Sequence, residues 1–240
     1  MSEIKRFLET YPYLGTALLV LSLSFGGFVM FRSRRTEILL SGLLALPFAT
    51  WAIVLVPEYW TPRLWLGYGR IGLEDFVWAF GTGCLVWLSA AIATKSSLTM
   101  HPRFTTVLCR YAIVSAIGLS VFAPLWIFGI KVMGAFVASV VTLGIFLGCI
   151  RPNLWRLAVY GGFGFGLINL LVTKAAVLFC PAYYQQVALG ALSGLTFWDL
   201  PIEEVYWAFA SGATWALLIG FVLDVRRTSP DLSSESPPFL

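Results

Sequence analysis

The sequence predicts an all-α integral membrane protein, a seven-transmembrane helical bundle with an internal parallel three-helix repeat. Of its 240 residues, 59% are hydrophobic and 12% are charged, against roughly 25% charged in ordinary soluble domains. Uncharged runs of about 20 residues, the length that spans a bilayer, recur along the whole chain. In lipid each run must be helical, because every backbone polar group needs an internal partner.

Seven runs are expected to form one transmembrane domain over residues 1–224. The predicted spans are Pro12–Phe31, Thr36–Val56, Gly72–Thr94, Thr106–Phe128, Val132–Ile150, Leu154–Leu178 and Pro201–Asp224. The first run is longer than a signal-peptide core and ends in Arg32-Ser33-Arg34-Arg35, which predicts a retained span. The segment 225–240 is rich in Ser and Pro with mixed charge, so we expect a disordered tail.

The basic residues of the short loops set the expected orientation, because cytoplasmic loops carry an excess of Lys and Arg. One side collects Arg32, Arg34, Arg35, Lys95, Arg103, Arg151, Arg156, Arg226 and Arg227, and the other collects Lys5, Arg6, Arg63, Arg70 and Lys131. The larger set should face the cytoplasm. The sequence therefore predicts an inner (cytoplasmic) membrane protein with its N-terminus outside and its C-terminus inside, and argues against a nucleic-acid-binding surface.

A duplicated motif lies in the third and seventh spans. Residues 72–83, GLEDFVWAFGTG, align without gaps with residues 201–212, PIEEVYWAFASG. The two spans are separated by an even number of crossings, so they run in the same direction. This pattern predicts a parallel repeat with halves over about 12–94 and 132–224, joined by a connector span over 106–128.

The paired acids of this motif, Glu74, Asp75, Glu203 and Glu204, are the candidate catalytic residues. An ionisable group at the centre of a span costs roughly 2.5–3.5 kcal/mol on insertion scales. At a helix start the cost is lower, because the helix dipole favours a carboxylate there. For Asp75 and Glu204, such a capping role is an equal alternative to a functional one.

Two tryptophans supply the reason to expect acid chemistry. Glu74 and Trp78 are four residues apart, as are Glu203 and Trp207, so each acid shares a helix face with an indole. An apolar wall favours the neutral form of a carboxyl, and two nearby acids titrate apart, giving a proton donor beside a carboxylate. Aromatic faces also stabilise cations. We expect Glu74 and Glu203 to face one apolar cavity suited to protonating an isolated alkene.

At these residues the chain resembles the lycopene cyclase domain family, the membrane carotenoid cyclases of the heterodimeric and fused type. That family carries a Pro-x-Glu-Glu or Pro-x-Glu-Asp motif at the start of a span in each half. Pro201-Ile202-Glu203-Glu204 matches the motif fully, whereas Gly72-Leu73-Glu74-Asp75 lacks the proline. The family usually has Phe-rich residues after the acids, where this chain has Trp-Ala-Phe twice.

The resemblance implies acid-initiated cyclisation of the end groups of a linear carotenoid or related isoprenoid, an isomerisation without net redox change. By analogy, Glu74 and Glu203 protonate the terminal double bond or hold the cation, and Asp75 and Glu204 assist or accept the departing proton. The expected substrate-binding residues are Trp78, Phe80, Tyr206, Trp207, Phe209, Asn169 and Lys174.

Two polar residues of the sixth span have their own alternatives. Lys174 is the only intramembrane lysine, and we expect it to extend toward the outer interface, with an ion pair to Glu203 or Glu204 as the functional alternative. Asn169 either packs against a neighbouring helix or orients an acid.

No cofactor or metal is expected. The chain has no GxGxxG fingerprint for a flavin, and its four cysteines have no CxxC spacing. The expected partners are an apolar polyene or isoprenoid lipid and the surrounding membrane lipids, and the sequence is compatible with an oligomer.

Three other functions compete with the cyclase interpretation. The chain could be a non-catalytic protein that binds a pigment or prenyl lipid, as a subunit of a larger membrane complex. A retinal-binding photoreceptor needs a lysine in the last span, and Pro201–Asp224 contains none. A proton-driven transporter is less favoured, because no span shows a break at its centre.

Overall fold

The computed structural model describes residues 3–94, 98–100, 103–186 and 192–227. Seven helical segments of this part of the chain are long and apolar enough to cross a membrane, and they are Pro12–Met30, Arg32–Leu55, Leu73–Ala93, Phe104–Ile127, Val132–Ile150, Pro152–Phe179 and Ile202–Val222. The predicted all-α, multi-pass membrane bundle is confirmed, and each predicted span overlaps one of these segments.

The elements follow one another in a regular order. They are α1 (Glu3–Thr10), α2 (Pro12–Met30), η1 (Arg32–Arg34), α3 (Arg35–Ala45), η2 (Leu46–Trp51), α4 (Ala52–Leu55), β1 (Gly67–Tyr68), β2 (Ile71–Gly72), α5 (Leu73–Ala93), β3 (Leu98–Thr99), α6 (Phe104–Ile127), α7 (Val132–Ile150), η3 (Pro152–Leu154), α8 (Trp155–Phe179), η4 (Pro181–Gln186), β4 (Thr196–Phe197), β5 (Leu200–Pro201), α9 (Ile202–Val222) and β6 (Arg226–Arg227).

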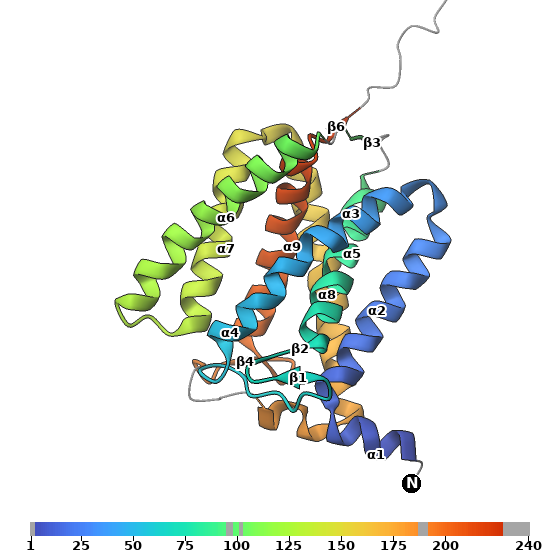
Figure 1. The fold of residues 1–240 in the computed structure, drawn as a ribbon, viewed down its shortest axis with the longest axis vertical. Helices are drawn as coiled ribbons and strands as arrows, with labels where there is room; N and C mark the ends of the chain where they lie inside the picture. The colour runs from blue at the N-terminus through green and yellow to red at the C-terminus, as the bar shows by residue number, and fades with distance from the viewer. Residues whose placement is uncertain (1–2, 95–97, 101–102, 187–191, 228–240) are drawn as a thin grey trace, which may run out of the picture.

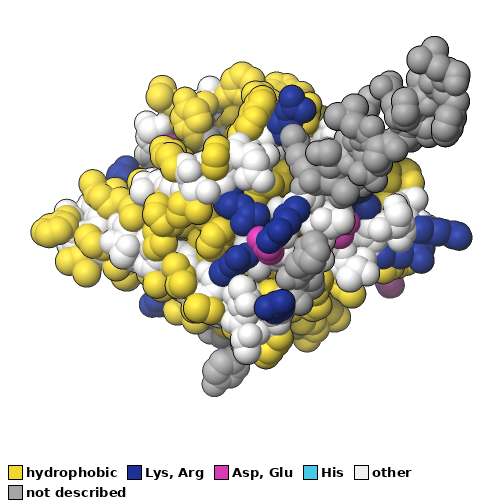
Figure 2. All heavy atoms as spheres, turned by 90° about the horizontal axis from the view of Figure 1, so that it is seen from above, with side chains coloured by type: hydrophobic (Ala, Val, Ile, Leu, Met, Phe, Trp, Pro, Cys, Tyr) yellow, Lys and Arg dark blue, Asp and Glu magenta, His cyan; other side chains and the backbone are white. Residues whose placement is uncertain are grey.

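The bundle has two unlike ends (Figure 1). The hairpin end carries the two-stranded hairpins β1–β2 and β4–β5 and the start of the chain. The opposite end, here named the arginine end, carries β3 paired with β6. Figure 2 views the molecule from this second end and shows dark-blue basic side chains gathered near the middle of the face.

The second span, predicted over Thr36–Val56, is one helical segment over Arg32–Leu55, but its middle changes from α-helix to 3-10 helix. The α-helix α3 ends at Ala45, and the 3-10 segment η2 follows with Pro47 near its start. Proline lacks an N–H and its ring clashes with the preceding turn, so the α-helical hydrogen-bond ladder stops there. The span is therefore distorted at Pro47 and remains helical, because η2 joins α3 and α4 directly.

The two halves of the repeat pack in the same way. In the first half, α2 and α3 both pack against α5, and in the second half α7 and α8 both pack against α9. The connector α6 packs mainly against α7 and lies at the side of the bundle (Figure 1). The helices α5 and α9 are thus the inner members of two similar three-helix units.

The hairpins repeat down to single hydrogen bonds. The antiparallel register pairs Gly67 with Gly72 in the first hairpin and Thr196 with Pro201 in the second. Just after each hairpin, the first helical N–H donates to a carbonyl that precedes the hairpin, from Leu73 to Leu66 at 2.8 Å and from Ile202 to Leu195 at 2.9 Å. The chain therefore enters both inner helices through equivalent hairpins.

Part of the expected disordered tail is ordered. Val225 is fully buried, and Arg226–Arg227 forms β6, which pairs with Leu98–Thr99. The reason is a short polar turn after α9 that ties this segment to the bundle. The rest of the predicted tail, 228–240, lies outside the described residues.

Asp224 makes that tie. Its carboxylate accepts hydrogen bonds from Arg151 and Arg226, both at 3.0 Å, and lies 3.4 Å from the Arg110 guanidinium. The hydrogen bond from Arg151 is the largest influence, and these basic groups hold the pKa of Asp224 at about 2, below its ordinary value. The arginine end is thus fastened by an ionised carboxylate.

Candidate functional site

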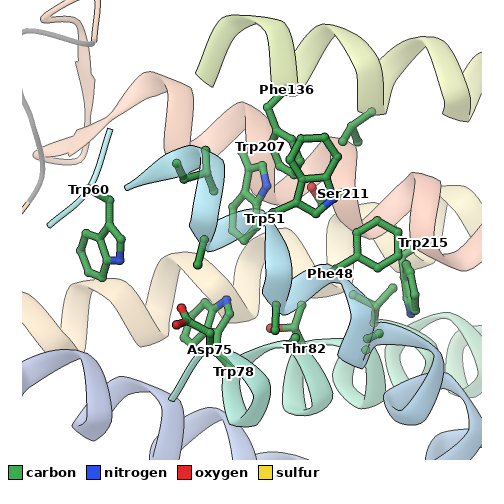
Figure 3. Close-up of a pocket in the computed structure, with 18 of the residues that line it drawn as sticks. Phe48, Trp51, Trp60, Asp75, Trp78, Thr82, Phe136, Trp207, Ser211 and Trp215 are labelled. Atoms are coloured by element: carbon green, nitrogen blue, oxygen red, sulfur yellow. The ribbon is translucent and has the colours of Figure 1, made fainter. Parts of the chain in front are cut away.

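A cavity of about 260 Å³ lies between the two halves of the repeat, and its walls are mostly apolar (Figure 3). Its lining residues are Tyr13, Ala45, Phe48, Ala49, Trp51, Ala52, Leu55, Tyr59, Trp60, Asp75, Trp78, Ala79, Thr82, Gly83, Val86, Met133, Phe136, Val140, Leu143, Tyr183, Glu204, Trp207, Ser211, Thr214, Trp215 and Leu218. Its acidic lining residues are Asp75 and Glu204, and none of the described residues that line it is a Lys or Arg.

The repeat builds this cavity from matching positions of its inner helices. On α5 the lining residues include Asp75, Trp78 and Thr82, and on α9 they include the aligned Glu204, Trp207 and Ser211. The spacing i, i+3, i+7 follows one face of a helix. Figure 3 shows the labelled members of these two rows on opposite sides of side chains from η2.

Residues of η2, the 3-10 part of the second span, complete the wall. Phe48 and Trp51 come from η2 and contact both halves, since Phe48 meets Trp215 edge-to-face at 5.2 Å and Trp51 meets Phe136 at 5.0 Å between ring centroids. Irregular backbone at membrane depth is tolerated where it lines a cavity rather than lipid. The change from α-helix to 3-10 helix at Pro47 therefore places two large aromatic side chains in the cavity wall.

Asp75 is held by two donors. Tyr13 on α2 donates its hydroxyl to Asp75 Oδ1 at 2.9 Å, and the backbone N–H of Gly72 donates to Oδ2 at 2.8 Å. The second bond is the N-terminal capping contact of α5, in which the third helical residue reaches back to the residue before the helix. Asp75 therefore caps its helix and also lines the cavity.

Glu204 occupies the matching position without such support. The residue that precedes α9 is Pro201, which has no N–H to donate. No hydrogen bond reaches the Glu204 carboxyl from the residues that the structure describes. The two cavity acids thus share a position in the repeat and differ in their partners.

Glu74 and Glu203 do not meet in the cavity, which corrects the expectation that they would. Glu74 is 1% exposed, and its Oε1 accepts the N–H groups of Trp65 at 2.5 Å and Leu66 at 3.3 Å. Glu203 Oε1 accepts the N–H of Ser193 at 2.5 Å. Both acids turn toward the chain that enters their own hairpin, because unpaired backbone N–H groups are available there.

The other aromatic predictions divide by helix face. Trp78 and Trp207 line the cavity, whereas Tyr206 is 62% exposed on the lipid-facing side of α9. Phe80 packs against Gly42 and Cys84 of the first half, and Phe209 packs against Gly166 and Phe163 of α8. The structure therefore places Tyr206, Phe80 and Phe209 outside the cavity.

The polar residues of α8 also lie outside the cavity lining. Lys174 forms an ion pair with Asp199 at 2.9 Å and lies 5.4 Å from the Trp198 ring centroid, both in the second hairpin. It extends to the hairpin end as expected, but its partner is neither Glu203 nor Glu204. Asn169 is buried within α8 and does not line the cavity.

Several cavity residues were not predicted from the sequence, above all Tyr13, Phe48 and Trp51. Tyr13 lies at the start of the first span, where an interfacial role is the ordinary interpretation of a tyrosine. The signal for Phe48 and Trp51 was Pro47, whose position in mid-span predicts a break and hence residues that point inward.

No group of three or more His, Cys, Asp and Glu side chains in the described part of the chain could hold a metal ion. Comparison of the chain with models of protein families, with characterised proteins and with solved structures finds no match. Function must therefore be argued from the cavity itself.

Proposed function

We propose that the protein is a lycopene-cyclase-like isomerase that cyclises an end group of a linear carotenoid or related isoprenoid inside the membrane. The observation that carries the proposal is the pair Asp75 and Glu204, which line one apolar, aromatic cavity from equivalent positions of a repeat. The motif Pro201-Ile202-Glu203-Glu204, which resembles that of the lycopene cyclase domain family, supports the same class of reaction.

The reaction needs one acid and one base. A carboxylic acid gives its proton to the inner carbon of the terminal double bond, which leaves a tertiary cation at the outer, dimethyl-substituted carbon. The next double bond attacks this cation to close a carbon–carbon bond. A carboxylate then removes a proton from the carbon beside the new cation, which forms the ring double bond. The substrate gains and loses one proton, and proton exchange between the two carboxyls and water restores the enzyme.

The cavity walls suit the cationic intermediate. Indole rings of Trp78, Trp207 and Trp215 line the cavity with few polar atoms between them. Aromatic faces attract a cation by about 2 kcal/mol or more when water is excluded. The same walls keep water from adding to the cation, which would otherwise give an alcohol.

The cavity volume limits what enters. At about 260 Å³ it lies below the roughly 300–1,000 Å³ usual for pockets that enclose a drug-sized ligand. One end group of a carotenoid fits such a space, and the rest of the polyene must extend between helices toward the lipid. We expect each end to be cyclised in a separate binding event.

The proposal is tested by expression in a bacterial host that accumulates lycopene, with the carotenoids separated by chromatography. The wild-type chain should produce cyclic carotenoids, and Asp75→Asn or Glu204→Gln should lower their yield by at least about 100-fold. The matched control is Glu58→Gln, an exposed acid at the hairpin end. An unchanged pigment profile with wild-type protein in the membrane would overturn the cyclase and favour a pigment or prenyl-lipid binder.

One observation favours a proton-coupled transporter, namely the 3-10 distortion at Pro47 beside two cavity acids. In transporters built from repeats, interrupted helices occur at corresponding positions of both halves. Here α8, the counterpart of the second span, is α-helical throughout from Trp155 to Phe179. The unequal halves therefore favour the enzyme.

We assign the protein to the inner (cytoplasmic) membrane, with the arginine end in the cytoplasm and the N-terminus outside. The excess of loop Arg and Lys residues on that side supports the assignment. Fusion of a reporter that is active only in the cytoplasm to the C-terminus should give signal, and fusion to the N-terminus should not. The opposite result would invert the topology.

A further inference from the structure

The two cavity acids begin their helices differently, and the difference is one N–H group. In the first half the N–H of Gly72 donates to Asp75 Oδ2 at 2.8 Å. In the second half the aligned residue is Pro201, whose nitrogen carries no hydrogen. A capping box needs that N–H, so Glu204 cannot form the contact that Asp75 forms.

Asp75 is surrounded by donors suited to its charged form. Besides Gly72, the hydroxyl of Tyr13 donates to Asp75 Oδ1 at 2.9 Å. Hydrogen bonds donated to a carboxylate favour the ionised form, and each bond to a charged group is stronger than one between neutral groups. Both oxygens of Asp75 are therefore prepared to carry negative charge.

Glu204 meets the opposite surroundings. It receives no hydrogen bond from the described residues, and no Lys or Arg is among the residues that line the cavity. The titratable groups that share the lining are Asp75, Tyr13, Tyr59 and Tyr183, none of which supplies positive charge. A carboxyl in such apolar surroundings, without a hydrogen-bond donor or a positive charge, favours its neutral form.

We infer that Glu204 is the proton donor and Asp75 the proton acceptor, and that Pro201 and Tyr13 are positioning residues that fix these roles. The inference rests on the proposed function. Glu204 loses its proton to the inner carbon of the terminal double bond, the next double bond attacks the tertiary cation and the ring closes, and the Asp75 carboxylate takes the proton from the carbon beside the ring cation. One proton enters the substrate and one leaves it.

The role assignment can be tested without turnover. Infrared spectra of purified protein in lipid nanodiscs at neutral pH distinguish the C=O stretch of a protonated carboxyl from the bands of a carboxylate. The wild type minus Glu204→Gln difference should contain a protonated-carboxyl band, and the wild type minus Asp75→Asn difference should contain carboxylate bands. The reverse pattern, or a carboxylate pattern for both residues, overturns the assignment even if the protein is an active cyclase.

A single substitution tests the role of Pro201. Its φ of −55° and ψ of 134° are open to alanine, so Pro201→Ala adds an N–H without forcing the backbone to move. The new N–H should cap Glu204, weaken its protonated-carboxyl band and lower the rate of ring formation about tenfold or more, the scale of one hydrogen bond to a charged group. Pro152→Ala, at the start of η3, is the matched control.

The possible outcomes distinguish a failure of the role assignment from a failure of the proposed cyclase function. If the wild-type chain forms cyclic carotenoids and Pro201→Ala changes neither the infrared band nor the rate, the role assignment fails and the cyclase stands. If the infrared bands follow the assignment and no cyclic product forms in any linear-carotenoid host, the cyclase fails, and Glu204 remains the protonated acid of a ligand cavity.

Discussion

The two halves of the repeat share a scaffold and differ in chemistry. Both present a hairpin, an inner helix and an acid at the third helical position that lines one cavity. In the first half that acid is bonded to Tyr13 and Gly72, and in the second half the aligned residue before the helix is Pro201. Duplication thus supplies two equivalent carboxyls, and one residue next to each helix makes them different.

The shared part of the scaffold is set by close helix contacts. A Cβ at Gly83 would lie 2.7 Å from the carbonyl oxygen of Ser41 on α3, and a Cβ at the aligned Gly212 would lie 2.5 Å from the carbonyl oxygen of Gly161 on α8. Backbone atoms cannot move aside as a flexible side chain can. Only glycine therefore lets each inner helix approach its neighbour this closely.

The largest expected loss of stability comes from adding a side chain at these two glycines. Gly83→Leu and Gly212→Leu should each destabilise the bundle by at least about 3 kcal/mol, because the side chain overlaps backbone of a neighbouring helix. The measurement is the yield of monodisperse protein in detergent and its thermal unfolding. If only one variant were damaged, the halves would not be equivalent in packing.

Gly26→Ala is the matched control for this prediction. Gly26 lies on α2, and no atom lies within 4 Å of a Cβ built there. Because glycine costs a helix about 0.5–1 kcal/mol relative to alanine, this variant should be as stable as the wild type or slightly more stable.

The first acids of the two motifs should differ in their effect on stability. Glu74→Ala leaves the part-buried N–H groups of Trp65 and Leu66 without their acceptor and should cost about 2 kcal/mol. Glu203→Ala removes the acceptor of one exposed N–H, that of Ser193, and should cost about half as much. Thermal unfolding in detergent measures both, and a larger loss for Glu203→Ala would contradict the hydrogen-bond pattern.

Variants of Glu74 and Asp75 distinguish a structural role of the first acid of the motif from a catalytic role. Glu74→Gln keeps an acceptor oxygen for the hairpin, so it should retain most of the cyclase activity that Asp75→Asn loses. If Glu74→Gln were as inactive as Asp75→Asn, the first acid of the motif would also take part in the reaction.

The sequence predicted the spans and the repeat because both depend on long-range regularities. An uncharged run of about 20 residues has no stable alternative to a helix in lipid, and an aligned acid, tryptophan and glycine pattern fixes which helices correspond. The site was harder to predict. Both the i+3 and the i+4 residue share a helix face with a given side chain, so Trp78 is a neighbour of Asp75 as well as of Glu74.

The hairpins decided which acid faces the cavity. The backbone N–H groups of Trp65 and Leu66 donate to Glu74 Oε1, which leaves Asp75 to face the interior. Two-residue strands carry no periodic pattern, so the hairpins could not be predicted from hydropathy. Pro47 was the available signal for the 3-10 segment in the second span. The uniform hydropathy of the run does not reveal such a change of helix type.

The arginine ends of the inner helices should also behave differently. The chain after α9 is fastened by Asp224 to Arg151, Arg110 and Arg226, whereas the aligned position after α5 is Lys95 in the sequence. Asp224→Asn should cost about 1–2 kcal/mol, because it removes a partly exposed ion-pair network.

This contribution should depend on pH in a defined direction. The pKa of Asp224 is about 2 in the folded protein, below roughly 3.9 in an unfolded chain. Its stabilisation is therefore complete above pH of about 4 and is lost as pH falls toward about 2. The gap in thermal stability between wild type and Asp224→Asn should close over that interval, and a gap that persisted at the lowest pH would exclude ionisation as its source.

Tyr13→Phe is the smallest of the expected effects and the most direct test of the difference between the halves. The substitution removes one of the two donors to Asp75 and leaves the ring in place, so it should cost about 1 kcal/mol of stability. It also makes Asp75 more like Glu204, with less support for its negative charge. Under the role assignment, product formation should fall about tenfold, and the infrared carboxylate bands of Asp75 should weaken while the protonated band of Glu204 stays. Equal changes at both acids would mean that Tyr13 holds the cavity as a whole rather than Asp75 in particular.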